Sequence, residues 1–243
     1  MRERLILLPG WGLGASPLQP LAVALQDLGS FARVDLQPLP ELPGGEPSAW
    51  LDALDATLPR DAWLAGWSLG GMLAAGLAAR RGERCPGLIT LASNACFVAR
   101  DDWPDAMARE TFEAFLAGCE TNPQATLKRF TLLCAQGSED PRALARLLAG
   151  AASGLSPVQL RHGLEVLARL DLRTALKAYR GPQLHLFGAR DALVPVTAAS
   201  AVRAFLPQAH IGLIERACHA FALDTPHEVA AAILAFLHEY PDD

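Results

Sequence analysis

Short apolar runs alternate with longer amphipathic segments along the first part of the chain. The apolar runs predict buried strands at 4–8, 32–36, 62–66 and 88–92, and the segments between them predict helices near 17–28, 47–57 and 70–80. Strands that alternate with helices are typical of a parallel sheet covered by helices on both faces. This part of the sequence therefore predicts an α/β fold.

The alternation stops near residue 100 and resumes near residue 182. The intervening segments predict helices alone, at 107–116, 125–134, 142–151 and 157–169. Two more strands are then predicted at 182–188 and 209–214, followed by a helix from about residue 226. We therefore predict a core made of 1–99 and 179–243, with 100–178 inserted as a helical lid. The lid is not a separate domain, because the sheet is completed on both sides of it.

The segment Gly66-Trp67-Ser68-Leu69-Gly70 has the spacing G-x-S-x-G, between a predicted strand and a predicted helix. A serine at such a sharp turn has its hydroxyl held out at the top of the sheet, where it can act as a nucleophile. Glycines are needed there because a side chain at Gly66 or Gly70 would collide with the adjoining helix or strand. The alternative is an ordinary strand–helix turn with a capping serine.

A serine nucleophile needs an acid and then a histidine further along the chain. Asp191 follows the strand predicted at 182–188, at the edge of the sheet where α/β proteins place their chemistry. Aspartate is also common in loops as a turn former. Asp171 and Asp224 are competing acids, but Asp171 falls in the helical insertion and Asp224 follows the histidine candidate.

His219 is the candidate base, because it lies in the loop after the last predicted strand and completes the order Ser68, Asp191, His219. The other five histidines fall within predicted strands or helices. A neutral imidazole can take the serine proton, while the carboxylate fixes its tautomer and stabilises the imidazolium. The oxyanion that forms needs two donors, for which we expect the backbone N–H groups of Leu69 and of Trp11.

Composition narrows the class of protein. The chain has 243 residues, half of them apolar, and a formal charge of -5, which gives no reason to expect a nucleic acid partner. No apolar run is long enough to span a membrane, and the run at 5–8 is too short for a secretory signal. The odd number of cysteines and the absence of metal-ligand spacing indicate reduced thiols and no metal. We expect a cytoplasmic monomer without a cofactor. Cys218 beside His219 could suggest a cysteine enzyme, but no turn or helix start frames it.

Basic residues gather in the second half of the insertion of this acidic chain, among them Arg129, Arg142 and Arg146. Arg142 and Arg146 are four residues apart and so share one helix face. Scattered charges of this kind usually form a solvated face. The alternative is a docking surface for an acidic partner, attracted by complementary charge.

Taken together, these motifs resemble those of the α/β-hydrolases, and within them the pimeloyl-[acyl-carrier protein] methyl ester esterases of biotin synthesis. The resemblance covers nearly the whole chain. The segments that carry it are 10–13, 66–71, 91–104, 163–167, 171–173 and 191–195. The segment that ends in Asp102-Trp103-Pro104 is more particular to these esterases than the serine motif, which other esterases share.

The resemblance implies the nucleophile Ser68, the acid Asp191 and the base His219, as well as substrate contacts at Trp11, Leu69 and the stretch from Phe130 to Cys134. It also implies that Arg129, Arg142 and Arg146 hold an acyl-carrier protein. One further basic position of the family is Ala125 here, with Lys128 nearby. Many relatives also have an extra hairpin before the first strand, and a histidine where this chain has Pro9.

The function expected from these features is hydrolysis of the methyl ester of a pimeloyl chain carried by acyl-carrier protein. Phe130, Leu132 and Leu133 are expected to line an apolar channel for the methylene chain. The main alternative is a carboxylesterase of broad specificity that acts on short free esters. A binding protein without hydrolytic activity, a carbon–carbon hydrolase and a haloperoxidase-like enzyme are further alternatives, because a fold does not fix a reaction.

Overall fold

The computed structural model describes residues 2–152 and 154–240. Its strands are β1 (Arg2–Leu8), β2 (Phe31–Leu36), β3 (Trp63–Trp67), β4 (Leu88–Leu91), β5 (Gln183–Gly188) and β6 (His210–Ile214). The helices of the core are α1 (Gln19–Asp27), α2 (Pro47–Thr57), α3 (Leu69–Arg81), α8 (Arg173–Ala178), α9 (Thr197–Phe205), α10 (Phe221–Asp224) and α11 (Pro226–His238). Those of the insertion are α4 (Arg109–Thr121), α5 (Pro123–Ala135), α6 (Pro141–Ala151) and α7 (Pro157–Arg169).

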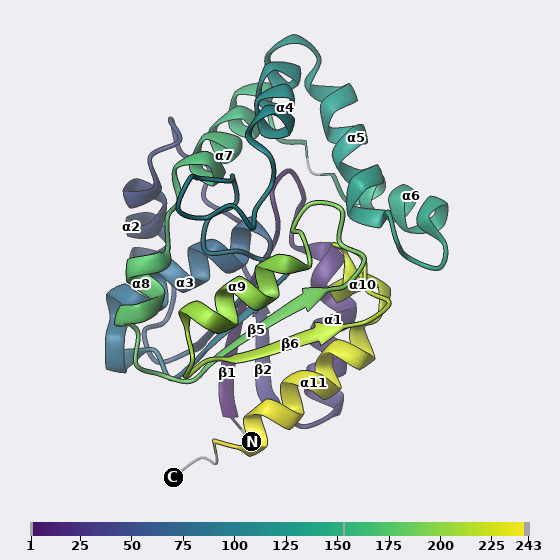
Figure 1. Cartoon of the computed structure of the whole chain (residues 1–243). Coiled ribbons are helices and arrows are strands. Elements are labelled where there is room, and N and C mark those ends of the chain that lie inside the picture. Colours follow the sequence, from purple (N-terminus) through teal and green to yellow (C-terminus); the bar gives the residue numbers. More distant parts are fainter. Residues whose placement is uncertain (1, 153, 241–243) are drawn as a thin grey trace.

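In the described part of the chain, six strands form one sheet in the order β2-β1-β3-β4-β5-β6, and every neighbouring pair is parallel. The central strands β3 and β4 are buried along their whole length because both faces of the sheet are covered. Helices α1 and α11 pack together, and α3 contacts both α2 and α8 (Figure 1). The prediction of a parallel sheet with helices on both faces is therefore confirmed.

Helices α4, α5, α6 and α7 of the insertion lie beyond the carboxyl ends of the strands, toward the top of Figure 1. They come between β4 and β5, and the chain then returns through α8. Helices α5, α6 and α7 each begin at a proline whose preceding residue caps the helix: Asn122, Asp140 and Ser156 accept backbone N–H bonds with their side chains. These caps and N1 prolines explain why the insertion divides into separate short helices.

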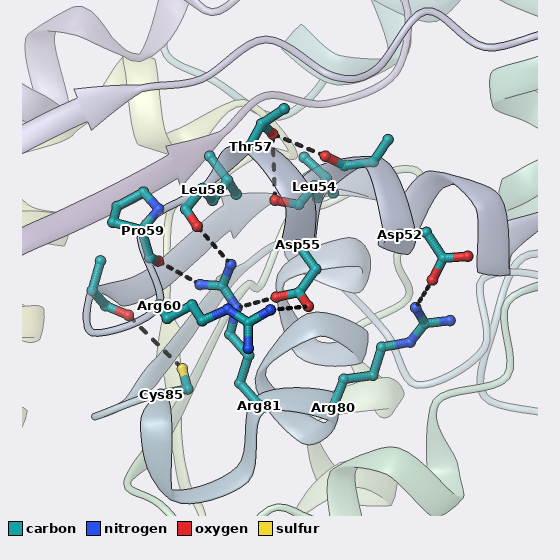
Figure 2. A network of polar contacts seen from close by, with 12 residues as sticks. Asp52, Leu54, Asp55, Thr57, Leu58, Pro59, Arg60, Arg80, Arg81 and Cys85 are labelled. Carbon is teal, nitrogen blue, oxygen red and sulfur yellow. Dashed lines mark hydrogen bonds and ion pairs between the residues drawn. The ribbon is translucent and has the colours of Figure 1, made fainter.

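A network of polar contacts fixes the far end of α3 (Figure 2). The guanidinium of Arg81 is buried and donates to the carbonyl oxygens of Leu58 and Pro59, which follow α2, and to the carboxylate of Asp55. Asp55 also accepts an ion pair from Arg60, and its pKa is lowered by the hydrogen bond from Arg81. The C-terminal end of α3 is thus tied to α2 and to the residues that follow it.

Some elements were not foreseen from the sequence. Helices α8, α9 and α10 are present where no helix was predicted, and α4 runs to Thr121 rather than ending near residue 116. Helix α8 has only six residues, too short for a clear helical period. Helix α9 has an apolar face formed by Ala198, Ala199 and Val202, which are buried, but its nine residues are rich in alanine and the sequence prediction did not include it.

Candidate functional site

The turn at Ser68 has the geometry of a strained strand-to-helix turn. Ser68 has φ of 55° and ψ of -120°, which a non-glycine residue rarely adopts. A Cβ on Gly66 would come within 2.2 Å of the backbone of Gly70, and one on Gly70 within 2.4 Å of the carbonyl oxygen of Pro9. The collisions expected at both glycines are therefore confirmed. Strain of this kind costs about 1–3 kcal/mol and persists only where the surroundings enforce it.

Hydrogen bonds to the backbone of Ser68 enforce that conformation. Its N–H donates to the carbonyl oxygen of Leu91 at 2.8 Å. Its own carbonyl accepts from the Oγ of Ser93 at 2.8 Å and from the N–H of Met72 at 3.1 Å. The role of Ser93 was missed from the sequence, because a serine just after a strand gives no signal of what it will bond.

Asp191 and His219 form a buried pair at the carboxyl ends of β5 and β6. The Nδ1 of His219 lies 2.8 Å from the Oδ2 of Asp191, and the two side chains are 0% and 1% exposed. The other carboxylate oxygen, Oδ1, accepts the backbone N–H groups of Leu193 at 2.8 Å and Val194 at 2.9 Å. The two backbone N–H groups donate to the carboxylate of Asp191, and so does Nδ1 of His219 when it carries the proton. The contacts therefore fit a carboxylate that only accepts hydrogen bonds and an imidazole whose proton is on Nδ1.

The rival acids lie elsewhere. Asp224 faces the Sγ of Cys218, 3.9 Å away, and burial raises its pKa. Asp171 forms an isolated bridge with Cys96 and an ion pair with Arg173. The structure thus brings Asp191 to His219, and it does not bring the other two there.

His219 is held next to the turn that carries Ser68. The indole N–H of Trp67 donates to the carbonyl oxygen of His219 at 2.8 Å, and the two rings lie 5.7 Å apart between centroids. The Nε2 of His219 is buried and has no hydrogen-bond partner among the described residues. One imidazole nitrogen is therefore fixed by Asp191 while the other remains free to accept a proton beside the serine.

The loop after β1 packs against the same turn. A Cβ on Gly10 would lie 3.3 Å from the indole of Trp67 and 3.4 Å from the Cβ of Ser68. In residues 2–152 and 154–240, the N–H groups of Trp11 and Leu69 have no backbone or side-chain acceptor. Leu69 is also the first residue of α3, so its N–H lies at the positive end of the helix dipole. These two groups are free to bind an anionic oxygen.

A narrow apolar cavity begins at Ser68 and runs beneath the insertion. Its walls come from α4, α5, α7 and the loop after β4, and include Trp11, Phe97, Phe112, Phe115, Phe130 and Leu167. The ring of Phe130 stands edge-on to Trp11, with 4.9 Å between the centroids. The free volume is about 10 Å³, close to what one water molecule occupies.

A larger cavity of about 280 Å³ lies beside the first, and Trp11 borders both. It is lined by the loop at 10–14, the segment 38–42 and part of α7, and it includes Leu69. Trp11 is fixed between the two cavities because its indole N–H donates to the carbonyl oxygen of Leu160 at 2.7 Å. The two cavities thus meet at one of the expected substrate contacts.

Other expected substrate contacts lie away from these cavities. Cys134 is fully buried, lines neither cavity, and accepts the N–H of Ala220 at its carbonyl. Its burial does not favour a direct contact with substrate. Leu132 is 52% exposed, so the expectation that it lines a channel is wrong. Burial raises the pKa of the Cys218 thiol to about 12, which argues against a cysteine nucleophile.

Comparison with known proteins decides the family. Residues 48–226, most of the chain, match the family described as the alpha/beta hydrolase fold. The chain belongs to the α/β-hydrolase family. A bromoperoxidase from Bacillus anthracis superposes on this α/β-hydrolase with a TM-score of 0.85, covering 98% of this chain and 92% of its own at 20% identity. An esterase from Exiguobacterium antarcticum gives a TM-score of 0.83, covering 97% and 92% at 18% identity. These two likenesses show the fold.

Relatives of higher identity place the α/β-hydrolase more narrowly. A pimeloyl-[acyl-carrier protein] methyl ester esterase of Aromatoleum aromaticum is 37% identical over 96% of this chain and 97% of its own length. The biotin biosynthesis bifunctional protein BioHC of Cellvibrio japonicus is 39% identical over 97% of this chain but 47% of its own length. The chain thus spans about half the length of that bifunctional relative, and nearly all of the esterase. The resemblance to the pimeloyl-[acyl-carrier protein] methyl ester esterases is confirmed.

The basic residues of this α/β-hydrolase divide into two groups. The arginines of α7 and α8 are paired with carboxylates, as in the ion pair between Arg161 and Glu165, and Lys177 of α8 lies against the ring of Phe205. The exposed basic residues of α5 and α6 make no ion pair within the described ranges 2–152 and 154–240; they are Lys128, Arg129, Arg142 and Arg146. We call these four residues the basic face. The guanidinium of Arg129 lies 5.0 Å from the ring of Phe115, which lines the narrow cavity.

Neither a metal site nor a membrane span is found in the described part of this α/β-hydrolase. No group of three or more histidine, cysteine, aspartate or glutamate side chains there is placed to hold a metal ion. No helix there has the length and apolarity to cross a bilayer. The five cysteines are all buried and unpaired.

Asp171 secures the junction between the insertion and the core, and this has a testable consequence. Arg173 contacts both Asp171 and Asp102 at 2.6 Å, and its hydrogen bond lowers the pKa of Asp171 from 3.8 to about 2. A carboxylate with a lowered folded-state pKa stabilises the protein above its unfolded pKa and loses that effect as the pH falls toward the folded value. Asp171→Asn should therefore lower the free energy of unfolding at pH 7, and the deficit should shrink between about pH 4 and pH 2.

Denaturant unfolding of the wild type and the variant over a series of pH values measures this deficit. The control is Asp61→Asn, because Asp61 is exposed and makes no ion pair within residues 2–152 and 154–240. It should cause little change at any pH. A deficit for Asp171→Asn that stays constant down to pH 2 would contradict the assigned ion pair.

Proposed function

We propose that this protein is a serine esterase that hydrolyses the methyl ester of pimeloyl-[acyl-carrier protein]. The observation that carries the esterase chemistry is the buried pair of Asp191 and His219 beside the strained turn at Ser68. The substrate is suggested by the names of relatives that align over nearly the whole chain. The basic face supports it as well, because acyl-carrier protein would be an acidic partner.

In the proposed reaction, Ser68 attacks the ester carbonyl carbon and its proton passes to the free Nε2 of His219. The carbonyl π electrons move onto the oxygen, where the N–H groups of Trp11 and Leu69 stabilise the negative charge. Each such donor is typically worth about 2.7–4 kcal/mol in the transition state. The tetrahedral intermediate then collapses, the bond to the methoxy oxygen breaks, and methanol leaves with the proton from His219.

Water completes the cycle by the same route. His219 takes one proton from water as its oxygen attacks the acyl-enzyme carbonyl, and Ser68 regains that proton as the carboxylic acid is released. The acid then loses its own proton to solvent and becomes the carboxylate. Asp191 stays ionised throughout and stabilises the imidazolium at each step. The same aspartate and imidazole act in both halves of the cycle, which agrees with the burial and hydrogen bonding that hold Asp191 and His219 in place.

In this proposal the segment 100–178 acts as a lid, except that α8 at its end packs on the core helix α3. The lid supplies the apolar site for the methylene chain, with Phe130 and Trp11 at its entrance. Burying each methylene contributes about 0.8 kcal/mol. A pimeloyl chain does not fit the present free volume of the narrow cavity, about 10 Å³. A chain bound in the narrow cavity would require the side chains of α4 and α7 to move apart, whereas the neighbouring cavity of about 280 Å³ is already open beside Trp11 and Leu69.

Methanol release from the methyl ester of pimeloyl-[acyl-carrier protein] tests the proposed function directly. Purified protein should release methanol in proportion to enzyme, with a kcat/KM well above that for short free esters. Comparable values for the carrier-linked ester and for p-nitrophenyl butyrate would instead favour the carboxylesterase of broad specificity.

Charge reversal on the basic face separates docking of the carrier from chemistry. Arg129, Arg142 and Arg146 changed together to Glu should lower kcat/KM for the carrier-linked ester by about 10- to 1,000-fold, the range attributed to electrostatic steering. The effect should weaken as salt is raised, because added ions screen exposed charges. The kcat/KM for p-nitrophenyl butyrate should stay within about twofold, since no charge near Ser68 changes.

The matched control reverses the charge of Arg84, Lys177 and Arg180. These residues come before β4 and β5, so they lie at the amino ends of the strands, opposite the end that carries Ser68. It makes the same change in net charge and should leave kcat/KM unchanged for both substrates. If the two triple variants lose the same activity on the carrier-linked ester, net charge rather than the basic face guides the carrier.

A further inference from the structure

The C-terminal end of α5 touches the loops that carry Asp191 and His219. The carbonyl oxygen of Cys134 accepts the N–H of Ala220, the residue after His219, at 3.1 Å. The turn that follows α5 contains Gly137, which packs directly against Arg190, the residue before Asp191. One helix end thus contacts the chain neighbours of both proposed catalytic residues.

Gly137 permits this contact for two separate reasons. Its φ is +100°, a conformation that side-chain-bearing residues rarely adopt. A Cβ on Gly137 would also lie 2.6 Å from the carbonyl oxygen of Arg190 and 2.7 Å from its Cβ. Backbone atoms cannot yield as a flexible side chain can, so the Arg190 turn would have to move.

A movement of that turn reaches Asp191 through short connections. The N–H of Arg190 donates to the carbonyl oxygen of Ala217 at 2.9 Å, which ties the acid loop to the base loop. Asp191 itself is only one residue further along, and its carboxylate is oriented by three hydrogen bonds. The end of α5, the acid loop and the base loop therefore form a closed set of contacts.

We infer that Gly137 is a positioning residue, through which the end of α5 holds Asp191 in line with the imidazole of His219. The inference rests on the roles proposed above for Asp191 and His219, and it adds a residue that touches neither substrate nor the reacting atoms. It also gives the lid helix α5 a second task besides forming the cavity wall with Phe130.

Gly137→Ala tests this inference with p-nitrophenyl butyrate, whose hydrolysis does not depend on carrier docking. We expect kcat to fall by about tenfold or more while KM stays within about twofold, because the substrate contacts are untouched. Two glycine controls separate the causes. Gly29→Ala introduces a Cβ at φ +66° with nothing within 4 Å, and Gly150→Ala introduces one in open space on α6. Both should leave kcat unchanged.

A double-mutant cycle with Asp191→Asn shows whether Gly137 acts through the acid. In the Asp191→Asn background, Gly137→Ala should cost no more than about twofold in kcat, because the group it positions is already disabled. A further tenfold loss in that background would overturn the inference, as would a wild-type kcat for Gly137→Ala alone. If Gly137→Ala does not fold, Gly137→Asn is used in the same cycle, since asparagine tolerates positive φ but still carries a Cβ.

The cycle also keeps the inference apart from the proposed function. If Asp191→Asn alone leaves kcat unchanged, the proposed acid is wrong and the mechanism fails. If Asp191→Asn is strongly impaired while Gly137→Ala is not, the mechanism stands and the positioning role alone is overturned.

Discussion

Replacing Ser68 with Ala should reduce ester hydrolysis by about 10⁴-fold or more, the scale on which loss of a nucleophile acts in such enzymes. No neighbouring group can substitute for it, because the Cys218 thiol is buried with a raised pKa and the free nitrogen of His219 is the proposed base. The substitution removes one oxygen atom and leaves the glycines of the turn unchanged. The folded structure should therefore persist, with an unfolding midpoint close to that of the wild type.

Steady-state hydrolysis of p-nitrophenyl butyrate measures the loss, and covalent labelling by an organophosphonate ester gives an independent readout. Labelling should be lost in Ser68→Ala and kept in Ser200→Ala, a control at an exposed serine on α9. Turnover by the Ser68→Ala variant at the wild-type rate would contradict the proposed mechanism.

Asp191→Asn should lower kcat by about 10⁴-fold, and the structure explains why this nearly isosteric change is so costly. The N–H groups of Leu193 and Val194 both point at Oδ1, so the amide oxygen of the new Asn must face them. Its NH₂ group then faces the Nδ1 of His219 as a donor. The imidazole has to carry its proton on Nε2 instead, where it can no longer accept one from Ser68.

The measurement is kcat over a range of pH, with Asp224→Asn as the matched control. Asp224 is a partly buried carboxylate near the same loop, but it faces Cys218 rather than the imidazole. That variant should retain most of its activity. Equal losses for the two variants would show that activity needs both carboxylates alike, and would remove the special role assigned to Asp191 through its contact with His219.

The strands of the core could be predicted from the sequence because most of them are short apolar runs followed by a clear turn. The serine turn was found for a related reason: glycine is required at 66 and 70 by close backbone contacts, and this requirement is visible as a motif. The pairing of Asp191 with His219 followed from position alone, since both residues come just after adjacent parallel strands.

Other features depend on contacts between distant segments, and these leave no local pattern. Ser93 bonds the carbonyl of Ser68 only because β3 and β4 are neighbours in the sheet. Gly137 reads as an ordinary turn glycine until the acid loop is placed against it. The exposure of Leu132 could not be derived either, because the helix that carries it was predicted without knowledge of which face meets the core.

The route from β4 to β5 shows how this fold can change what it recognises. These two strands are parallel neighbours, so the chain needs a crossover from the end of one to the start of the next. Helix α8 packs on α3 and makes that return by itself. Helices α4–α7 are thus a detour within a connection that would be complete without them. Evolution could lengthen, shorten or exchange most of that detour and so offer a different cover to a new ester, provided that the end of α5 kept its contacts with the acid and base loops.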